Sequence, residues 1–219
     1  MIRNRLSELL SERGLKTSRV AKEVKIARSS LTSMIQNDSE MIRYDAIDKL
    51  CRFLNIAPSD FFEFVPINID FTLTNAQQIF AVSNQDNCRD LSKVINFLLI
   101  ESEFLIDIEY KKELTTYDCE IELNEIKYSA FKNVFEFTLK KENEHNDLKQ
   151  KINELTPGLK NILFKRINKA LEETFKDNIY KELESSIAFP EFDEAEENEI
   201  LTRMEEADFV IKSNIFNEY

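Results

Sequence analysis

The chain has little of the two residues that mark sharply turning or flexible backbone, since its 219 residues include only 2 Gly and 4 Pro. This composition excludes a collagen-like protein, a linker-dominated protein and a Gly-rich phosphate-binding loop. Long apolar runs are also missing, and the segment Phe97–Ile100 is typical of the longest ones. A membrane helix needs ~20 apolar residues, so no membrane partner is expected.

Cysteine and histidine are scarce as well. Cys51, Cys88 and Cys119 are odd in number and widely spaced, which predicts buried thiols rather than a disulfide framework or a zinc knuckle. His145, the only histidine, lies in a polar run and is interpreted as a solvated loop residue. The charged start of the chain lacks the pattern of a signal peptide. We therefore expect a cytoplasmic protein with no metal site and no cofactor.

Charge is unevenly distributed along the chain. The total is −12, but residues 1–65 hold 11 Lys/Arg against 9 Asp/Glu, whereas residues 66–219 hold 18 against 32. Residues 1–37 alone have 8 basic and 3 acidic side chains, and no Phe precedes Phe53. Two halves of different charge and composition predict two domains with different partners, separated at Pro66.

The hydrophobic period changes at the same boundary. Over residues 1–66, apolar residues at helical spacing predict a compact domain of five helices, the first with a stripe from Ile2 to Leu10. Between residues 67 and 140, alternating segments predict an antiparallel sheet, with 90–102 interpreted as a helix. A long helix over 157–186 and a final helix capped by Asp193 and Glu196 follow. The prediction is a mainly α protein with an acidic α+β second domain over 67–219.

The most specific motif lies between Lys16 and Asn37. Small Ala21, together with apolar Val20 and Leu31, has the spacing of two helices that cross steeply over a short turn. Such a unit projects the outer face of its second helix, which fits the ~12 Å width of a DNA major groove. The alternative is a solvated polar face or a protein contact.

In these residues, and in the downstream segment 47–62, the sequence resembles the lambda-repressor/Cro (XRE) family of helix-turn-helix proteins over residues 2–65. Thr17 stands where the family usually has Gln, and Lys25 stands where it often has Gly. The resemblance implies a five-helix DNA-binding domain. A non-glycine residue at Lys25 would need a left-handed or relaxed turn.

By this resemblance, the helix that opens near Arg28 is the recognition helix. Its expected base-reading side chains face away from the apolar stripe, and Arg at the first position prefers the paired acceptors of guanine. They are Arg28, Ser29, Ser30, Thr32 and Ser33. The expected phosphate-binding residues flank this helix and the one before it, and are Lys16, Thr17, Arg19, Gln36, Asn37, Arg43 and Tyr44.

The acidic half shows no catalytic pattern. A self-cleaving peptidase half would need a cleavage pair with glycine, yet Gly14 and Gly158 are the only glycines and neither follows Ala or Cys. No enzyme is therefore expected. The remaining role is association, because two half-site readers joined as a homodimer bind DNA more specifically than one.

These observations predict a transcriptional repressor of a prophage or mobile genetic element. It would bind a double-stranded DNA operator as a dimer and be relieved by an inducing or antirepressor protein at residues 67–219. One alternative is an antitoxin-like or inhibitor protein that regulates its own gene through the helix-turn-helix. A third hypothesis is a small-molecule sensor.

Overall fold

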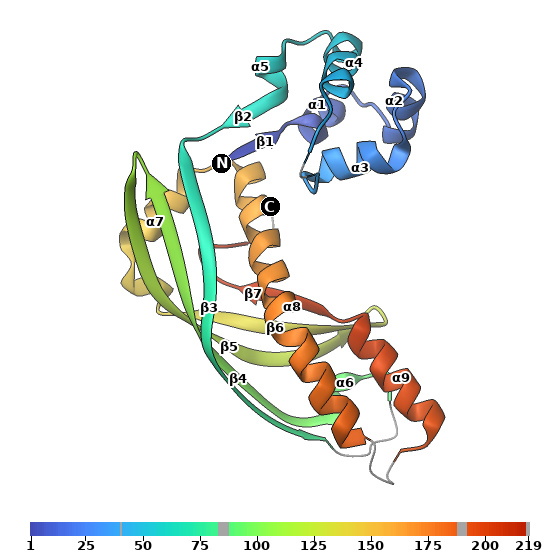
Figure 1. Ribbon diagram of the computed structural model, residues 1–219, viewed down its shortest axis with the longest axis vertical. Coiled ribbons are helices and arrows are strands. Elements are labelled where there is room, and N and C mark those ends of the chain that lie inside the picture. The colour runs from blue at the N-terminus through green and yellow to red at the C-terminus, as the bar shows by residue number, and fades with distance from the viewer. Residues whose placement is uncertain (40, 83–87, 188–191, 218–219) are drawn as a thin grey trace. The chain divides into compact units, whose positions relative to one another are not determined.

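The computed structural model describes residues 1–39, 41–82, 88–187 and 192–217, without the side chains of residues 75–77 (Figure 1). The chain divides into two compact units, Met1–Ile67 and Asn68–Tyr219. Each unit has its own set of buried apolar side chains. Among the described residues, the structure contains no helix with the length and apolarity to cross a bilayer.

The first unit is built on helices that bury one apolar stripe each. They are α1 (Leu6–Glu12), α2 (Thr17–Val24), α3 (Arg28–Gln36), α4 (Tyr44–Leu54) and α5 (Pro58–Phe61). Leu6, Leu31, Leu50 and Phe61 are fully buried, and together with their neighbours they form one core. Burial of apolar area at about 25 cal/mol per Å² is what holds such short helices in place.

The prediction of a five-helix domain is corrected at both ends of this unit. The helix α5 is a single turn of four residues, and a short antiparallel ribbon joins β1 (Ile2–Asn4) to β2 (Phe62–Phe64). Ile2 lies in β1 with its side chain 66% exposed, so it does not belong to the buried stripe of α1. A sequence period cannot reveal a strand of three residues, because its partner lies about sixty residues away.

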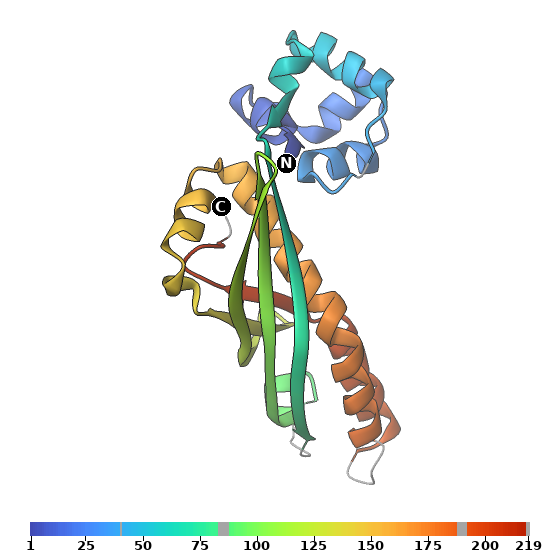
Figure 2. The ribbon, with the colours of Figure 1, turned by 60° about the vertical axis from the view of Figure 1, so that its left-hand side comes forward.

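The second unit is organised around a curved five-stranded sheet in the order β3-β4-β5-β6-β7 (Figure 2). Its strands are β3 (Ile67–Val82), β4 (Ile95–Tyr110), β5 (Glu113–Ser129), β6 (Lys132–Lys140) and β7 (Asp208–Lys212). Alternate residues of each central strand are buried, as in the Phe104, Ile106 and Ile108 series of β4. The alternating sequence pattern therefore reflects one packed face and one exposed face.

Three predictions about the fold are contradicted here. The sheet is mixed rather than antiparallel, because β7 pairs parallel to β6 after the long helices. The segment 90–102 is mostly strand: α6 covers only Leu91–Val94, and β4 begins at Ile95. With strands of 16 and 17 residues in β3, β4 and β5, the protein is not mainly α. A short continuous apolar run gives no period that separates strand from helix.

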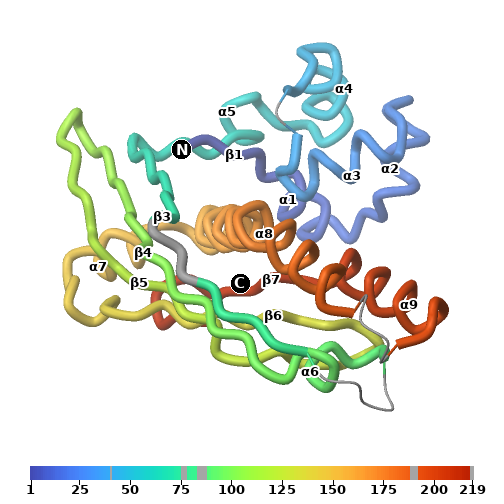
Figure 3. Tube along the Cα trace, turned by 60° about the horizontal axis from the view of Figure 1, so that its bottom comes forward, coloured from blue at the N-terminus to red at the C-terminus, as the bar shows by residue number. Residues whose placement is uncertain are grey.

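The long helix α8 (Pro157–Ile187) packs along one face of this sheet (Figure 3). Its buried residues recur every four positions from Leu159 to Leu183, and Phe175 stacks on Phe137 of β6 with ring centroids 5.3 Å apart. After it, α9 (Glu194–Glu205) begins with the expected capping box, in which Asp193 accepts from the Glu196 backbone and Glu196 accepts from the Asp193 backbone.

Two tight hairpins in the described part of the sheet turn without glycine. Lys111 and Lys112 join β4 to β5, and Ala130 and Phe131 join β5 to β6, all four at positive φ. A two-residue loop with positive φ at both positions matches the twist of the strands, and Asn-Gly is its favoured sequence. Because L-residues with side chains occupy this region at a cost, the long ladders on both sides must stabilise these turns.

A buried carboxylate holds the end of the chain against the sheet. Glu142 lies in the short 3-10 helix η1 (Glu142–Glu144) and is 5% exposed. It accepts hydrogen bonds from the Ser213 hydroxyl at 2.5 Å and from both the backbone and side-chain nitrogens of Asn214 at 2.5–3.1 Å. The segment after β7 is thereby fixed, with Ile215 and Phe216 buried.

Replacing Glu142 with alanine removes the buried carboxylate that accepts from the half-buried Ser213 hydroxyl and from both nitrogens of Asn214. We expect Glu142→Ala to lower the free energy of unfolding by about 3 kcal/mol. Chemical denaturation of the whole chain measures it, with exposed Glu144→Ala in the same turn as the control. Equal losses in the two variants would show that the cluster does not stabilise the fold.

Candidate nucleic-acid interface

The helices α2 and α3 form a two-helix unit with a short turn at residues 25–27. Val20, Ala21 and Val24 of α2 are buried, as are Leu31 and Met34 of α3. The small side chain of Ala21 allows the two helices to approach closely at this point. The outer face of α3 is left exposed, because the inner face supplies all of its packing.

The turn is made by a left-handed lysine. Lys25 adopts φ 54° and ψ 45°, and its backbone N–H donates to the Ala21 carbonyl to close α2. Ile26 then donates to the same carbonyl at 3.2 Å. The left-handed turn that the sequence would require at this non-glycine position is therefore present, with the conformational cost of a side chain.

The structure arranges the predicted base-reading residues in two groups. Arg28 and Ser29 are exposed in the first turn of α3, and Thr32 follows Arg28 one turn later. The Thr32 hydroxyl donates to the Arg28 carbonyl at 2.9 Å, so its proton is used within the helix while its oxygen can still accept. The hydroxyl groups of Ser30 and Ser33 lie on another side of the helix.

This second group borders a surface hollow of about 480 Å³ between α3, the turn before it and α4. Ser30 and Ser33 line it together with Arg43, which precedes α4. Lys25, Lys49 and Asp45 also line it, with Lys49 3.6 Å from the Asp45 carboxylate, and neither lysine was expected as a site residue. Lys25 was noted in the sequence only as the turn residue of the motif, and Lys49 is brought beside it by the packing of α4.

Most of the predicted phosphate-binding side chains are exposed, and Thr17 is half-buried. The exposed ones are Lys16, Arg19, Gln36, Arg43 and Tyr44. Arg43 is already paired, since its Nε lies 2.9 Å from the Asp45 carboxylate. Although desolvation raises the pKa of Asp45, the hydrogen bond and charge of Arg43 outweigh it and hold that pKa below its usual value. A phosphate at Arg43 must therefore compete with Asp45.

Asn37 has a different surrounding from the other phosphate candidates. It ends α3 at φ 56° and is half-buried, with its side-chain amide bonded to Asn4 of β1. Asn4, which sequence reasoning missed, is 3% exposed. Arg3 is likewise 8% exposed and ion-paired, so it does not add to the accessible positive charge counted over residues 1–37. No sequence pattern marks either residue, because their partners are distant in the chain.

The geometry is that of a helix-turn-helix unit, a class of DNA-binding module. The profile of the Cro/C1-type HTH DNA-binding domain matches residues 5–66. No curated protein and no solved structure gives a significant match to the chain. The first unit is therefore a Cro/C1-type DNA-binding domain, which confirms the resemblance stated for this segment, and the protein is a DNA-binding transcription regulator.

The left-handed turn at Lys25 predicts that glycine stabilises the protein at this position and destabilises it elsewhere in α2. Lys25→Gly should raise the free energy of unfolding by about 1 kcal/mol, because glycine adopts positive φ without steric cost. Lys22→Gly, at an exposed position within α2, should lower it by about the same amount. Urea unfolding of the full chain compares the two. If both substitutions destabilise alike, the turn at Lys25 is not left-handed.

Proposed function

We propose that the protein is a sequence-specific repressor whose helix α3 lies in the major groove of its operator. One observation supports this most directly: α3 begins with exposed Arg28 and Ser29 on a Cro/C1-type unit, while Leu31 and Met34 fix its inner face. The Arg28 guanidinium has the fork geometry that recognises guanine O6 and N7. Ser29, Ser30, Thr32 and Ser33 supply shorter contacts to bases or to the adjacent backbone.

The phosphate contacts in this proposal come from both sides of α3. Lys16, Thr17 and Arg19 lie at the start of α2, whose N-cap residue makes no side-chain cap hydrogen bond. Backbone N–H groups at such a helix end bind phosphate readily. Gln36, Arg43 and Tyr44 approach the backbone on the other side, and Tyr44 is 91% exposed.

We further propose that the regulator binds as a homodimer and controls genes of a prophage or mobile genetic element. A single module of this size contacts one half-site, and two linked modules gain affinity without new contacts. The origin rests on the likeness to Cro/C1-type domains alone. Residues 66–219, with 18 basic and 32 acidic side chains, are repelled by DNA and left for an inducing or antirepressor protein. No enzymatic step and no cofactor enter this proposal.

Base reading by Arg28 is tested by substitution. Arg28→Ala should reduce the preference for the best duplex by about tenfold or more, because one bidentate arginine–guanine contact discriminates by roughly 1–3 kcal/mol. Selection from a randomised duplex library, repeated with the variant, measures the change in base preference. Arg19→Ala is the matched control: it should weaken all duplexes alike and lower the salt dependence. An unchanged preference in Arg28→Ala refutes the recognition-helix assignment.

The dimer is tested on the selected duplex by hydroxyl-radical footprinting with the purified chain alone. We expect two symmetric protected half-sites with centres ~34 Å apart, one helical turn of DNA. A single protected half-site would contradict the dimer. Protection that appears only when a second protein is added would instead favour the antitoxin-like alternative.

A further inference from the structure

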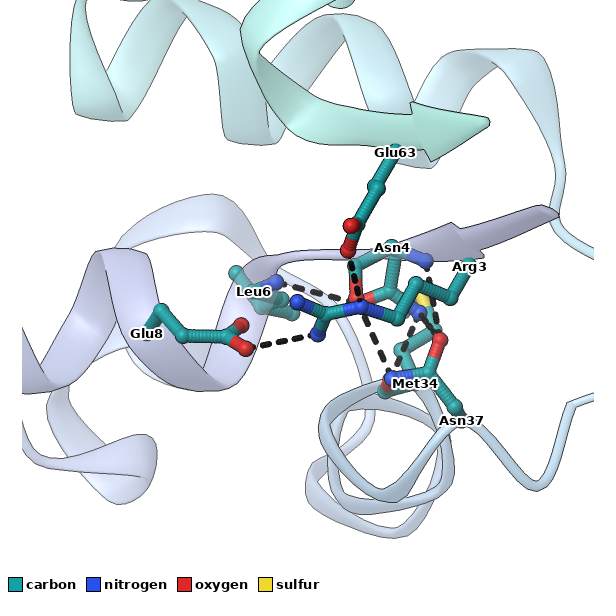
Figure 4. A network of polar contacts seen from close by, with 7 residues as sticks. All are labelled: Arg3, Asn4, Leu6, Glu8, Met34, Asn37 and Glu63. Atoms are coloured by element: carbon teal, nitrogen blue, oxygen red, sulfur yellow. Dashed lines mark hydrogen bonds and ion pairs between the residues drawn. The ribbon is translucent and has the colours of Figure 1, made fainter. Parts of the chain in front are cut away.

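The recognition helix is tied at its C-terminal end to the first strand of the chain (Figure 4). The Asn4 backbone N–H and side-chain nitrogen donate to Asn37 Oδ1 at 2.8 and 2.9 Å, and that same side-chain nitrogen donates to the Met34 carbonyl at 2.7 Å. Asn37 Nδ2 returns a bond to the Asn4 carbonyl at 3.1 Å. Asn4 Oδ1 is also used, since it accepts from the Leu6 backbone at 3.1 Å.

These bonds connect β1 with the end of α3, which lie 30–33 residues apart in the sequence. Asn37 also closes α3, with its own N–H on the Met34 carbonyl and the Asp38 N–H on the Ser33 carbonyl. The α3 end is therefore fixed twice, once within the helix and once against β1. Because the Asn4 amide is buried and fully bonded, moving α3 away from β1 would leave several polar atoms unpaired.

The neighbouring residue fastens β1 to β2. The Arg3 side chain is buried and lies between two carboxylates: its Nε pairs with Glu63 of β2, and its Nη1 pairs with Glu8 of α1 at 2.6 Å. The amino group of Met1 extends the ribbon, because it donates to the carbonyls of Val65 and Ile67. The residue before β1 is thus bonded to the residues that follow β2 within the same unit.

We propose that Asn4 and Asn37 are positioning residues for base discrimination: they set the orientation of α3 relative to the ribbon of β1 and β2, and Arg3 with Glu63 holds that ribbon. This inference rests on the proposed role of α3 as the recognition helix. A rotation of α3 by a small angle would move Arg28 relative to the base edges while leaving phosphate contacts, which tolerate displacement, nearly unchanged. The role of Asn37 is then to hold α3 in place rather than to bind phosphate.

The chain offers a matched control for Asn37. Asn55 ends α4 in the same way, at φ 53° and ψ 54°, but its side chain is exposed. Alanine at either position incurs the same left-handed backbone cost. Only Asn37→Ala also removes the side-chain bonds between Asn37 and Asn4, so a difference between the two variants reports those bonds.

The readout is the ratio of dissociation constants for two duplexes, the one the wild type selects from a randomised library and one of scrambled sequence. Full-length variants are compared below their melting temperatures. Partial unfolding lowers the active fraction equally for both duplexes, so the ratio responds to orientation and not to stability. We expect Asn37→Ala to reduce the ratio about tenfold and Asn55→Ala to leave it unchanged.

A second pair of variants tests the ribbon without touching α3. Glu63→Gln weakens the pairing with Arg3 and should lower the ratio about threefold, whereas exposed Glu12→Gln should not change it. Equal ratios for Asn37→Ala and Asn55→Ala overturn the proposal, as does an unchanged ratio for Glu63→Gln. An Arg28→Ala variant distinguishes failure of the positioning proposal from failure of the proposed function. If that variant also keeps the wild-type ratio, the recognition-helix assignment itself is refuted.

Discussion

The pairing of the buried amide of Asn4 with the half-buried amide of Asn37 is the constraint on which the geometry of the DNA-binding unit depends. Short helices pack through apolar stripes, and such packing tolerates small rotations, since its energy follows area rather than direction. Hydrogen bonds between a buried and a half-buried amide are directional and do not tolerate them. The unit therefore combines a core centred on Leu6, Leu31 and Leu50 that holds the helices together with a polar contact that fixes the angle of α3.

The second unit depends on a different constraint. Its long strands are joined by tight turns, yet the chain has only two glycines to occupy such turns. Eight non-glycine residues adopt positive φ in the described part of the chain, and four of them form the two hairpin turns. The cost is offset by extended ladders, by α8 lying along the sheet and by the carboxylate of Glu142 holding the residues after β7. Because glycine is scarce, residues with side chains occupy the positive-φ positions of this fold, and backbone strain is expected at those positions.

Sequence reasoning succeeded where the physics is local. The period of α8, the capping box at Asp193 and the spacing around Ala21 each depend on residues a few positions apart. It failed where the partner is distant: β1 is a strand because Phe62–Phe64 lies beside it, and β7 joins the sheet parallel to β6 after two helices. The candidate site followed the same division. The motif predicts Arg28 and Ser29 as base-reading residues, whereas the place of Lys49 beside the hollow and the bonding of Asn37 arise only from tertiary packing.

In the proposed function, α3 reads base edges in the major groove from a fixed orientation. Methylation of guanine at N7 adds a group to the major-groove edge that arginine would contact, so interference by this modification is the most direct measurement. If Arg28 contacts guanine there, one methylated guanine in each half-site of the selected duplex should abolish binding by the full chain. The proposal is contradicted if methylation of guanine N7 has no effect while modification of the minor groove or of phosphates alone prevents binding.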